Sequence, residues 1–128
     1  MTVREFMSAP PLTLDSETSV VNACKFMGEK HIGSILISRK GVTQAIFTER
    51  DLMSKVLLHE EDLTSVTVGA YGSSPLVTVS PETDVKEAAR IMTELKVKRL
   101  VVAQNGKPIG LFTSADLARA VGKFPLAL

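Results

Sequence analysis

The chain has 128 residues, of which 45% are hydrophobic and only 5% aromatic, and it contains no tryptophan. This length and composition suit one compact domain or two fused small halves, with a core of aliphatic side chains and methionines. The formal net charge of +1, from 15 basic and 14 acidic residues, argues against a long groove for nucleic acid.

The single cysteine and the hydropathy pattern restrict the setting of the protein. Cys24 cannot form an internal disulfide, and it falls on an apolar helical face where packing is favoured over a reactive thiol. No apolar run approaches the roughly 20 residues that span a bilayer, and the N-terminal sequence lacks the layout of a signal peptide. We therefore expect a soluble, cytoplasmic protein without membrane partners.

The elements recur in two halves. A shift of 65 residues aligns positions 3–56 with positions 68–121 without a gap, and sixteen of the 54 aligned positions are identical. Such a match indicates a tandem duplication, which has to be recognised before the fold is predicted.

Each half opens with a short extended piece and an amphipathic helix. The helices are predicted from apolar residues at i, i+3, i+4 and i+7. These pieces cover residues 11–14 and 20–27 in the first half, and 76–79 and 85–92 in the second. Thr18 and Thr83 stand where helix N-caps are expected.

Each half continues with a buried strand, a tight turn, a second strand and a second helix. The strands are predicted at residues 31–38, 43–47, 97–103 and 108–112. Gly41 and Gly106 mark the turns between them, the second within an Asn-Gly pair. The second helices begin at Thr48 and Thr113 and run to about Leu58 and Val121.

The predicted fold class is therefore α/β, of the α+β type. Each half contributes a small three-stranded sheet with two helices, and the halves are expected to pack face to face around a shared core. We expect residues 1–60 to form the first repeat, 61–67 an acidic and polar linker, and 68–128 the second repeat with a short C-terminal tail.

One motif occurs in both halves: the sequence FTERDL at residues 47–52 and FTSADL at residues 112–117. A threonine followed three positions later by an acidic residue resembles a capping box, which stabilises a helix start. The same geometry also suits a ligand, because free N–H groups and the helix dipole attract phosphate. An ionised aspartate can accept hydrogen bonds from two adjacent hydroxyls. Capping and ligand binding are compatible. One isolated copy would favour capping, whereas duplication in register within the frame described next favours a ligand.

These motifs, set in two full copies of the surrounding sequence, resemble a tandem pair of CBS domains, the unit often called a Bateman module. The likeness covers nearly the whole chain. It implies two clefts between repeats related by a pseudo-twofold axis, which bind adenosine-containing ligands such as AMP, ADP, ATP, NAD or S-adenosylmethionine. It implies no catalytic machinery. In such modules the aspartate binds ribose hydroxyls, the threonine contacts phosphate, and adenine lies among apolar residues.

The resemblance carries over to two sets of residues. The second motif has the glycine that lets backbone and ligand approach closely, with basic residues at the start of the buried strand. Its site is expected to combine Gly110, Leu111, Thr113, Ala115, Asp116 and Lys98 or Arg99 with Leu12, Ile32 and Gly33 of the opposite repeat.

The first motif departs from the family pattern, with Ala45 in place of the glycine. Arg50 is a candidate cation here, although an exposed helix-surface arginine is an equally good interpretation. This weaker site is expected to combine Ile46, Thr48, Arg50 and Asp51 with Val77, Val97 and Lys98.

Other kinds of site are disfavoured. His31 and His59 are far apart and lack further ligands at metal-binding spacing, so no metal site is predicted. No nucleophile, base and orienting residue stand in order, so we do not expect an enzyme. The basic group at Lys96, Lys98 and Arg99 is local, so we do not expect nucleic acid as a partner.

Two functions remain. The first is a stand-alone regulatory module that binds an adenosine-containing ligand and signals to an effector protein that the sequence does not identify. The second is a scaffold or dimerisation module with ligand-free clefts, in which the apolar second helices form a homodimer.

Overall fold

The computed structural model describes residues 1–123, so most of the expected C-terminal tail lies outside the described residues. The chain divides into two compact units. Residues 12–76 form what we call the central unit. Residues 1–11 and the chain from Val77 onward form the terminal unit. Each compact unit therefore contains the first segment of the other sequence repeat.

The central unit contains a three-stranded sheet in the order β1-β2-β3. Strand β1 runs parallel to β2, and β2 runs antiparallel to β3. Its elements are β1 (Thr13–Asp15), α1 (Val20–Lys30), β2 (Ser34–Arg39), β3 (Val42–Thr48), α2 (Glu49–Asp51), the π-helical η2 (Leu52–Leu57) and α3 (Val68–Tyr71).

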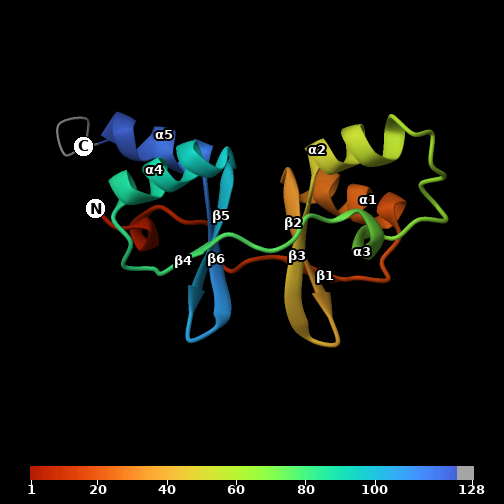
Figure 1. The fold of residues 1–128 in the computed structure, drawn as a ribbon, viewed down its shortest axis with the longest axis horizontal. Coiled ribbons are helices and arrows are strands. Elements are labelled where there is room, and N and C mark those ends of the chain that lie inside the picture. Colours follow the sequence, from red (N-terminus) through yellow and green to blue (C-terminus); the bar gives the residue numbers. More distant parts are fainter. Residues whose placement is uncertain (124–128) are drawn as a thin grey trace. The chain divides into compact units, whose positions relative to one another are not determined.

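The terminal unit repeats this plan with the order β4-β5-β6 and the same strand directions. Helix α4 contacts β5, helix α5 contacts β6, and the two helices contact each other (Figure 1). Its elements are η1 (Val3–Glu5), β4 (Thr78–Val79), α4 (Val85–Leu95), β5 (Arg99–Gln104), β6 (Lys107–Thr113) and α5 (Ser114–Lys123). The predicted α/β fold with two three-stranded sheets is confirmed, whereas η1 and α3 were not predicted.

Both predicted tight turns are confirmed. Lys40 and Gly41 have φ of 52° and 78°, and Asn105 and Gly106 have φ of 52° and 77°. Two successive positive φ values define the two-residue turn whose twist matches that of the adjoining strands. Gly and Asn tolerate this conformation best, while Lys40 adopts it within the hairpin.

The predicted helix caps were wrong by one residue. Ser19 caps α1 by accepting a hydrogen bond from the Asn22 N–H group, and Asp84 caps α4 by accepting one from Lys86. The two threonines have another task, because the Thr18 carbonyl accepts the N–H of Val68 and the Thr83 carbonyl accepts that of Val3, each at 2.9 Å. Each threonine anchors the segment that its unit receives from the other repeat. We call this the incoming segment; it comprises residues 1–11 in the terminal unit and residues 68–76 in the central unit.

The buried hydrophobic residues form two clusters, one in each unit, and the expected packing of the halves around a shared core stays a prediction. In the terminal unit, Val3 and Phe6 of the incoming segment pack with residues of β5, β6 and α4, and Phe112 is fully buried. In the central unit, Val68 of the incoming segment packs with Phe47 and residues of α1 and β2. The incoming segment supplies the apolar cover that each small sheet needs.

Candidate functional site

The first motif forms a reciprocal cap at the start of α2. The Thr48 N–H and hydroxyl groups donate to Asp51 Oδ2 at 2.9 and 3.2 Å, and the Asp51 N–H donates to Thr48 Oγ1 at 3.2 Å. The capping box predicted from the sequence is confirmed here.

The second motif repeats this geometry at the start of α5. The Thr113 N–H and hydroxyl groups donate to Asp116 Oδ2 at 2.8 and 3.0 Å, and the Asp116 N–H donates to Thr113 Oγ1 at 3.2 Å. Asp51 is 4% exposed and Asp116 is 7% exposed. Each half therefore holds a carboxylate close to the surface but almost completely covered.

The remaining backbone N–H groups at these helix starts differ in whether the protein supplies an acceptor. The carbonyls of Gly33 and Lys98 accept the first N–H groups of α2 and α5 at 3.0 Å. The Ala115 N–H group, one position further, has no hydrogen-bond partner within residues 1–123. A donor at the positive end of the ten-residue helix α5 is available to an anion.

Asp51 has a second set of partners in the central unit. Its Oδ1 atom accepts from the Ser73 hydroxyl and from Lys55 Nζ, both at 2.9 Å. Lys55 Nζ also donates to Ser73 Oγ and to the Tyr71 carbonyl, both at 3.1 Å. Both oxygens of this carboxylate are engaged by the protein itself.

Asp116 has fewer partners in the terminal unit. Arg119 Nη2 lies 3.1 Å from Asp116 Oδ1 and also donates to the Phe6 carbonyl at 2.5 Å. The guanidinium lies 5.8 Å from the centroid of the Phe6 ring, within cation–π range. The arginine side chain is 60% exposed, so this ion pair lies at the surface of the terminal unit.

The space beside the Cα atom of Gly110 is filled by another part of the chain. A Cβ atom at Gly110 would lie 2.7 Å from Met7 Sδ and 2.8 Å from the Ser8 carbonyl oxygen. The glycine was interpreted from the sequence as room for a ligand, and the observed neighbour is the incoming segment. At the equivalent positions of the central unit, Ala45 replaces Gly110 and Gly72 replaces Met7. The smaller residue is on the strand in one unit and on the segment in the other.

The predicted site residues fall into two sets, one in each unit. Leu12, Ile32, Gly33, Ile46, Thr48, Arg50 and Asp51 belong to the central unit, and Val77, Val97, Lys98, Arg99, Gly110, Leu111, Thr113, Ala115 and Asp116 belong to the terminal unit. Leu12 and Ile32 pack on the core of the central unit, and Val77 and Val97 on that of the terminal unit. The proposed combinations across units stay predictions.

Lys55, Ser73 and Arg119 were not identified from the sequence. Lys55 follows Asp51 by four residues and Arg119 follows Asp116 by three, which is the spacing of ion pairs on a helix. That spacing was a usable signal. Ser73 follows Asp51 by 22 residues, and no local pattern relates the two.

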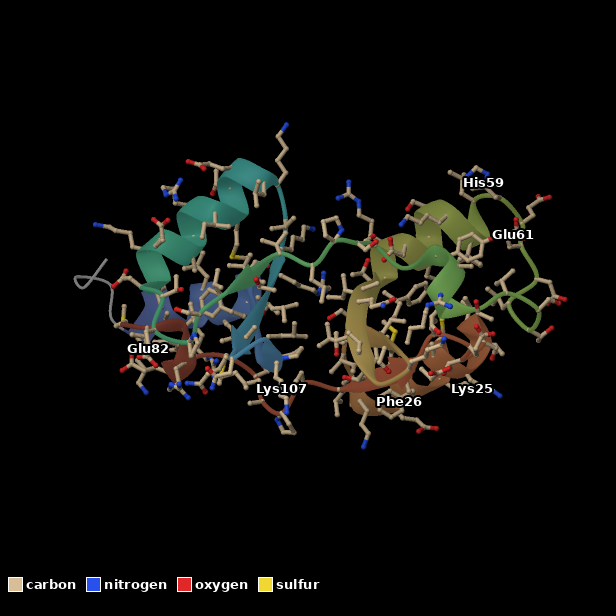
Figure 2. The ribbon with its side chains drawn as sticks, turned by 60° about the horizontal axis from the view of Figure 1, so that its bottom comes forward. Lys25, Phe26, His59, Glu61, Glu82 and Lys107 are labelled. Carbon is tan, nitrogen blue, oxygen red and sulfur yellow. The ribbon has the colours of Figure 1, made fainter. Side chains whose placement is uncertain are left out.

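No metal centre is formed within residues 1–123, where no three His, Cys, Asp or Glu side chains are grouped to hold an ion. His31 and His59 are both exposed. Figure 2 shows His59 just after η2, with Glu61 in the loop that follows. No described helix is long and apolar enough to cross a membrane.

The duplicated sequence, with a covered carboxylate in the first turn of α2 and of α5, defines a tandem-repeat α/β module. The CBS domain model matches residues 3–58 and 68–123, and the chain belongs to the CBS domain family. The resemblance stated from the sequence is confirmed. CBS-domain pairs are regulatory modules that generally bind adenosine-containing ligands, and they are generally not catalytic.

Known relatives support this assignment. The mitochondrial CBS domain-containing protein CBSX3 of Arabidopsis thaliana is 31% identical over 111 residues, which cover 83% of this chain and 54% of that protein. The chain thus spans about half the length of that relative.

Solved structures agree on the fold. A CBS-domain protein of Burkholderia ambifaria superposes with a TM-score of 0.86 at 30% identity, covering 93% of this chain and 90% of the other. Hypoxic response protein 1 is known from Mycobacterium tuberculosis. Its structure, described as having two coordinated zinc ions, superposes with a TM-score of 0.78 at 25% identity, covering 94% and 98% of the two chains.

Proposed function

We propose that this protein is a regulatory module that binds an adenosine-containing ligand and passes its state to an effector protein. AMP, ADP, ATP, NAD and S-adenosylmethionine are the candidate ligands. The observation that carries the proposal is the duplicated, covered aspartate in a chain of the CBS domain family. A non-catalytic role and a cytoplasmic location are part of the same proposal.

Asp116 is the better candidate of the two aspartates. An ionised carboxylate has about four acceptor positions on its two oxygens. The residues described engage four positions on Asp51 and three on Asp116. A sugar hydroxyl therefore finds an acceptor more readily at Asp116.

The surroundings of Asp116 suit a phosphate as well. The Ala115 N–H points from the positive end of α5, which favours negative charge. Lys98 is exposed, and its carbonyl binds the first N–H of the same helix. We propose that Lys98 or Arg99 supplies the cation. Thr113 would turn its hydroxyl from Asp116 to phosphate only by giving up one hydrogen bond of the cap.

The test is isothermal titration calorimetry with each of the five adenosine compounds, together with mass spectrometry of ligand released from the purified protein. Asp116→Asn keeps one acceptor for the cap and removes the charge. We expect it to weaken binding about ten- to a hundredfold, as for a lost hydrogen bond to a charged group. Asp62→Asn, an exposed aspartate in the central unit, is the matched control. Absence of binding to all five compounds at millimolar concentration would refute the proposal.

A second candidate function is homodimer formation. Met53, Leu57 and Leu58 on and just after η2 are 57%, 50% and 71% exposed, and Val121 on α5 is 42% exposed. Exposed apolar side chains of this kind favour burial against a second copy. Light scattering after size exclusion should report a dimer that Leu57→Glu converts to a monomer. An unchanged mass for the variant would remove this helix from the interface.

A further inference from the structure

Each aspartate of the two motifs is tied by a cation to the segment that its unit receives from the other repeat. We propose that Arg119 and Lys55 are latches that keep these carboxylates closed, so that a vicinal diol binds an aspartate only when its latch opens and the segment loses a contact. This inference rests on the proposed function and names residues that control the same site.

The count of acceptor positions is the first argument. The cap fills both positions of Oδ2 in each aspartate with the N–H and O–H groups of the threonine. Arg119 takes one position of Asp116 Oδ1, which leaves one without a donor within residues 1–123. A diol brings two O–H donors and needs two positions. Its second hydroxyl therefore competes directly with Arg119.

The central unit is closed more tightly by the same count. Lys55 and the Ser73 hydroxyl both donate to Asp51 Oδ1, so every position of this carboxylate is filled. A diol would have to displace two donors there. The two sites are therefore unequal, and the Asp116 site opens first.

The origin of the two cations is the second argument. Under the 65-residue shift, Arg119 corresponds to Ser54 and Lys55 corresponds to Ala120, so the cations stand at different positions of the repeat. Yet the two cations bind equivalent acceptors. Arg119 donates to the Phe6 carbonyl and Lys55 to the Tyr71 carbonyl, and Phe6 corresponds to Tyr71 under the same shift. Each cation also donates to the aspartate of its own unit. The same connection has been built twice with different side chains.

Through Arg119, Asp116 is connected to the incoming segment of the terminal unit. The N–H groups of Phe6 and Met7 bind the Val3 carbonyl, and Ser8 exchanges two hydrogen bonds with Leu111. These amides lie just before residue 11, where the chain leaves the terminal unit. Loss of the contact between Arg119 and the Phe6 carbonyl should increase local opening at these amides.

The first test uses hydrogen–deuterium exchange of the full chain without added ligand. Arg119→Met keeps the aliphatic packing and should speed exchange at Phe6–Ser8 about two- to tenfold, the usual range for one hydrogen bond. Arg90→Met is the matched control, because Arg90 is another exposed arginine of this unit that pairs only with carboxylates of its own helix. Equal exchange in wild type and Arg119→Met would overturn the attachment.

The second test compares AMP with 2′-deoxyadenosine 5′-monophosphate by calorimetry. The two probes have the same charge, so the ratio of their affinities isolates the diol. Arg119→Met should raise the preference for AMP about two- to tenfold, Arg119→Lys should change it less, and Arg90→Met should leave it unchanged. In the wild type, AMP should speed exchange at Phe6–Ser8 as the methionine variant does. An unchanged or lower preference in Arg119→Met, or unchanged or slower exchange with AMP, would overturn the latch.

The two proposals can fail separately. AMP binding to Arg119→Met but not to wild type supports the latch. No AMP binding to wild type, Arg119→Met or Lys55→Met overturns the competition with a diol. If the other four adenosine compounds also fail, the proposed function fails with it, while the exchange experiment still decides whether Arg119 attaches the segment.

Discussion

Replacement of Gly110 by alanine tests how the terminal unit accommodates its incoming segment. The new Cβ atom would lie 2.7 Å from Met7 Sδ and 2.8 Å from the Ser8 carbonyl oxygen, against 3.4–4 Å for ordinary contact. The thioether can move aside. The Ser8 carbonyl cannot move freely, because it accepts the Leu111 N–H at 3.0 Å while the Ser8 N–H donates to Leu111 at 2.8 Å.

The expected cost is that of overpacking a closed site. We predict that Gly110→Ala lowers the free energy of unfolding by about 1–3 kcal/mol. Gly28→Ala on helix α1 is the control, since nothing lies within 4 Å of its added Cβ. That change should raise stability by about 0.5–1 kcal/mol through the loss of helix-interior glycine.

A second substitution identifies the cause. The central unit carries Ala45 and Gly72 at the positions of Gly110 and Met7. Met7→Gly combined with Gly110→Ala therefore copies a pair that the chain already accepts. We expect Met7→Gly to cost less in the alanine background than in the wild type, with a coupling of about 0.5–3 kcal/mol.

Urea unfolding followed by circular dichroism measures all four proteins of the cycle and the Gly28→Ala control. Effects that add to within about 0.5 kcal/mol would refute the reasoning, because residues in contact should not behave independently. So would a Gly110→Ala variant as stable as the wild type.

Two further predictions concern titrating groups. Burial raises the pKa of the Cys24 thiol, so its alkylation by iodoacetamide should be slower at neutral pH than in urea-unfolded chain and should accelerate at higher pH; equal rate profiles would contradict this. Hydrogen bonds from the Thr64 hydroxyl, the Ser65 hydroxyl and the Thr64 N–H lower the pKa of the Asp62 carboxyl. The stability that this carboxylate contributes is present above its unfolded-state pKa and is lost as the pH falls through the folded-state pKa. In a carbon NMR titration, Thr64→Val should move the Asp62 pKa upward toward its ordinary value, and an unchanged titration curve would be evidence against the hydroxyl contact.

Local sequence patterns predicted the elements that depend on local physics. The tight turns at Lys40-Gly41 and Asn105-Gly106 were foreseen because the turn chemistry lies in those residues. The reciprocal caps of Thr48 with Asp51 and of Thr113 with Asp116 were foreseen from a spacing of three. Helices α1 and α4 were correctly located, while their caps at Ser19 and Asp84 were missed by one residue.

The missed features depend on contacts between residues far apart in the chain. Thr18 and Thr83 looked like caps, but their carbonyls bind Val68 and Val3 of the incoming segments. Gly110 was interpreted as leaving space for a ligand, because the sequence around Gly110 or around Met7 does not reveal that the two residues are in contact. Arg119 reaches a carbonyl 113 residues away.

The sequence by itself determined the duplication, the family, the order of the strands and of helices α1, α2, α4 and α5, and the two aspartates at helix starts. Those properties follow from periodicity and short spacings, which depend on neighbouring residues alone. Only the tertiary structure decided that each sheet is covered in part by a segment of the other repeat, and that Lys55 and Arg119 pair with the two carboxylates. Long-range packing selects those partners, because a small three-stranded sheet is stable only when further apolar surface covers it.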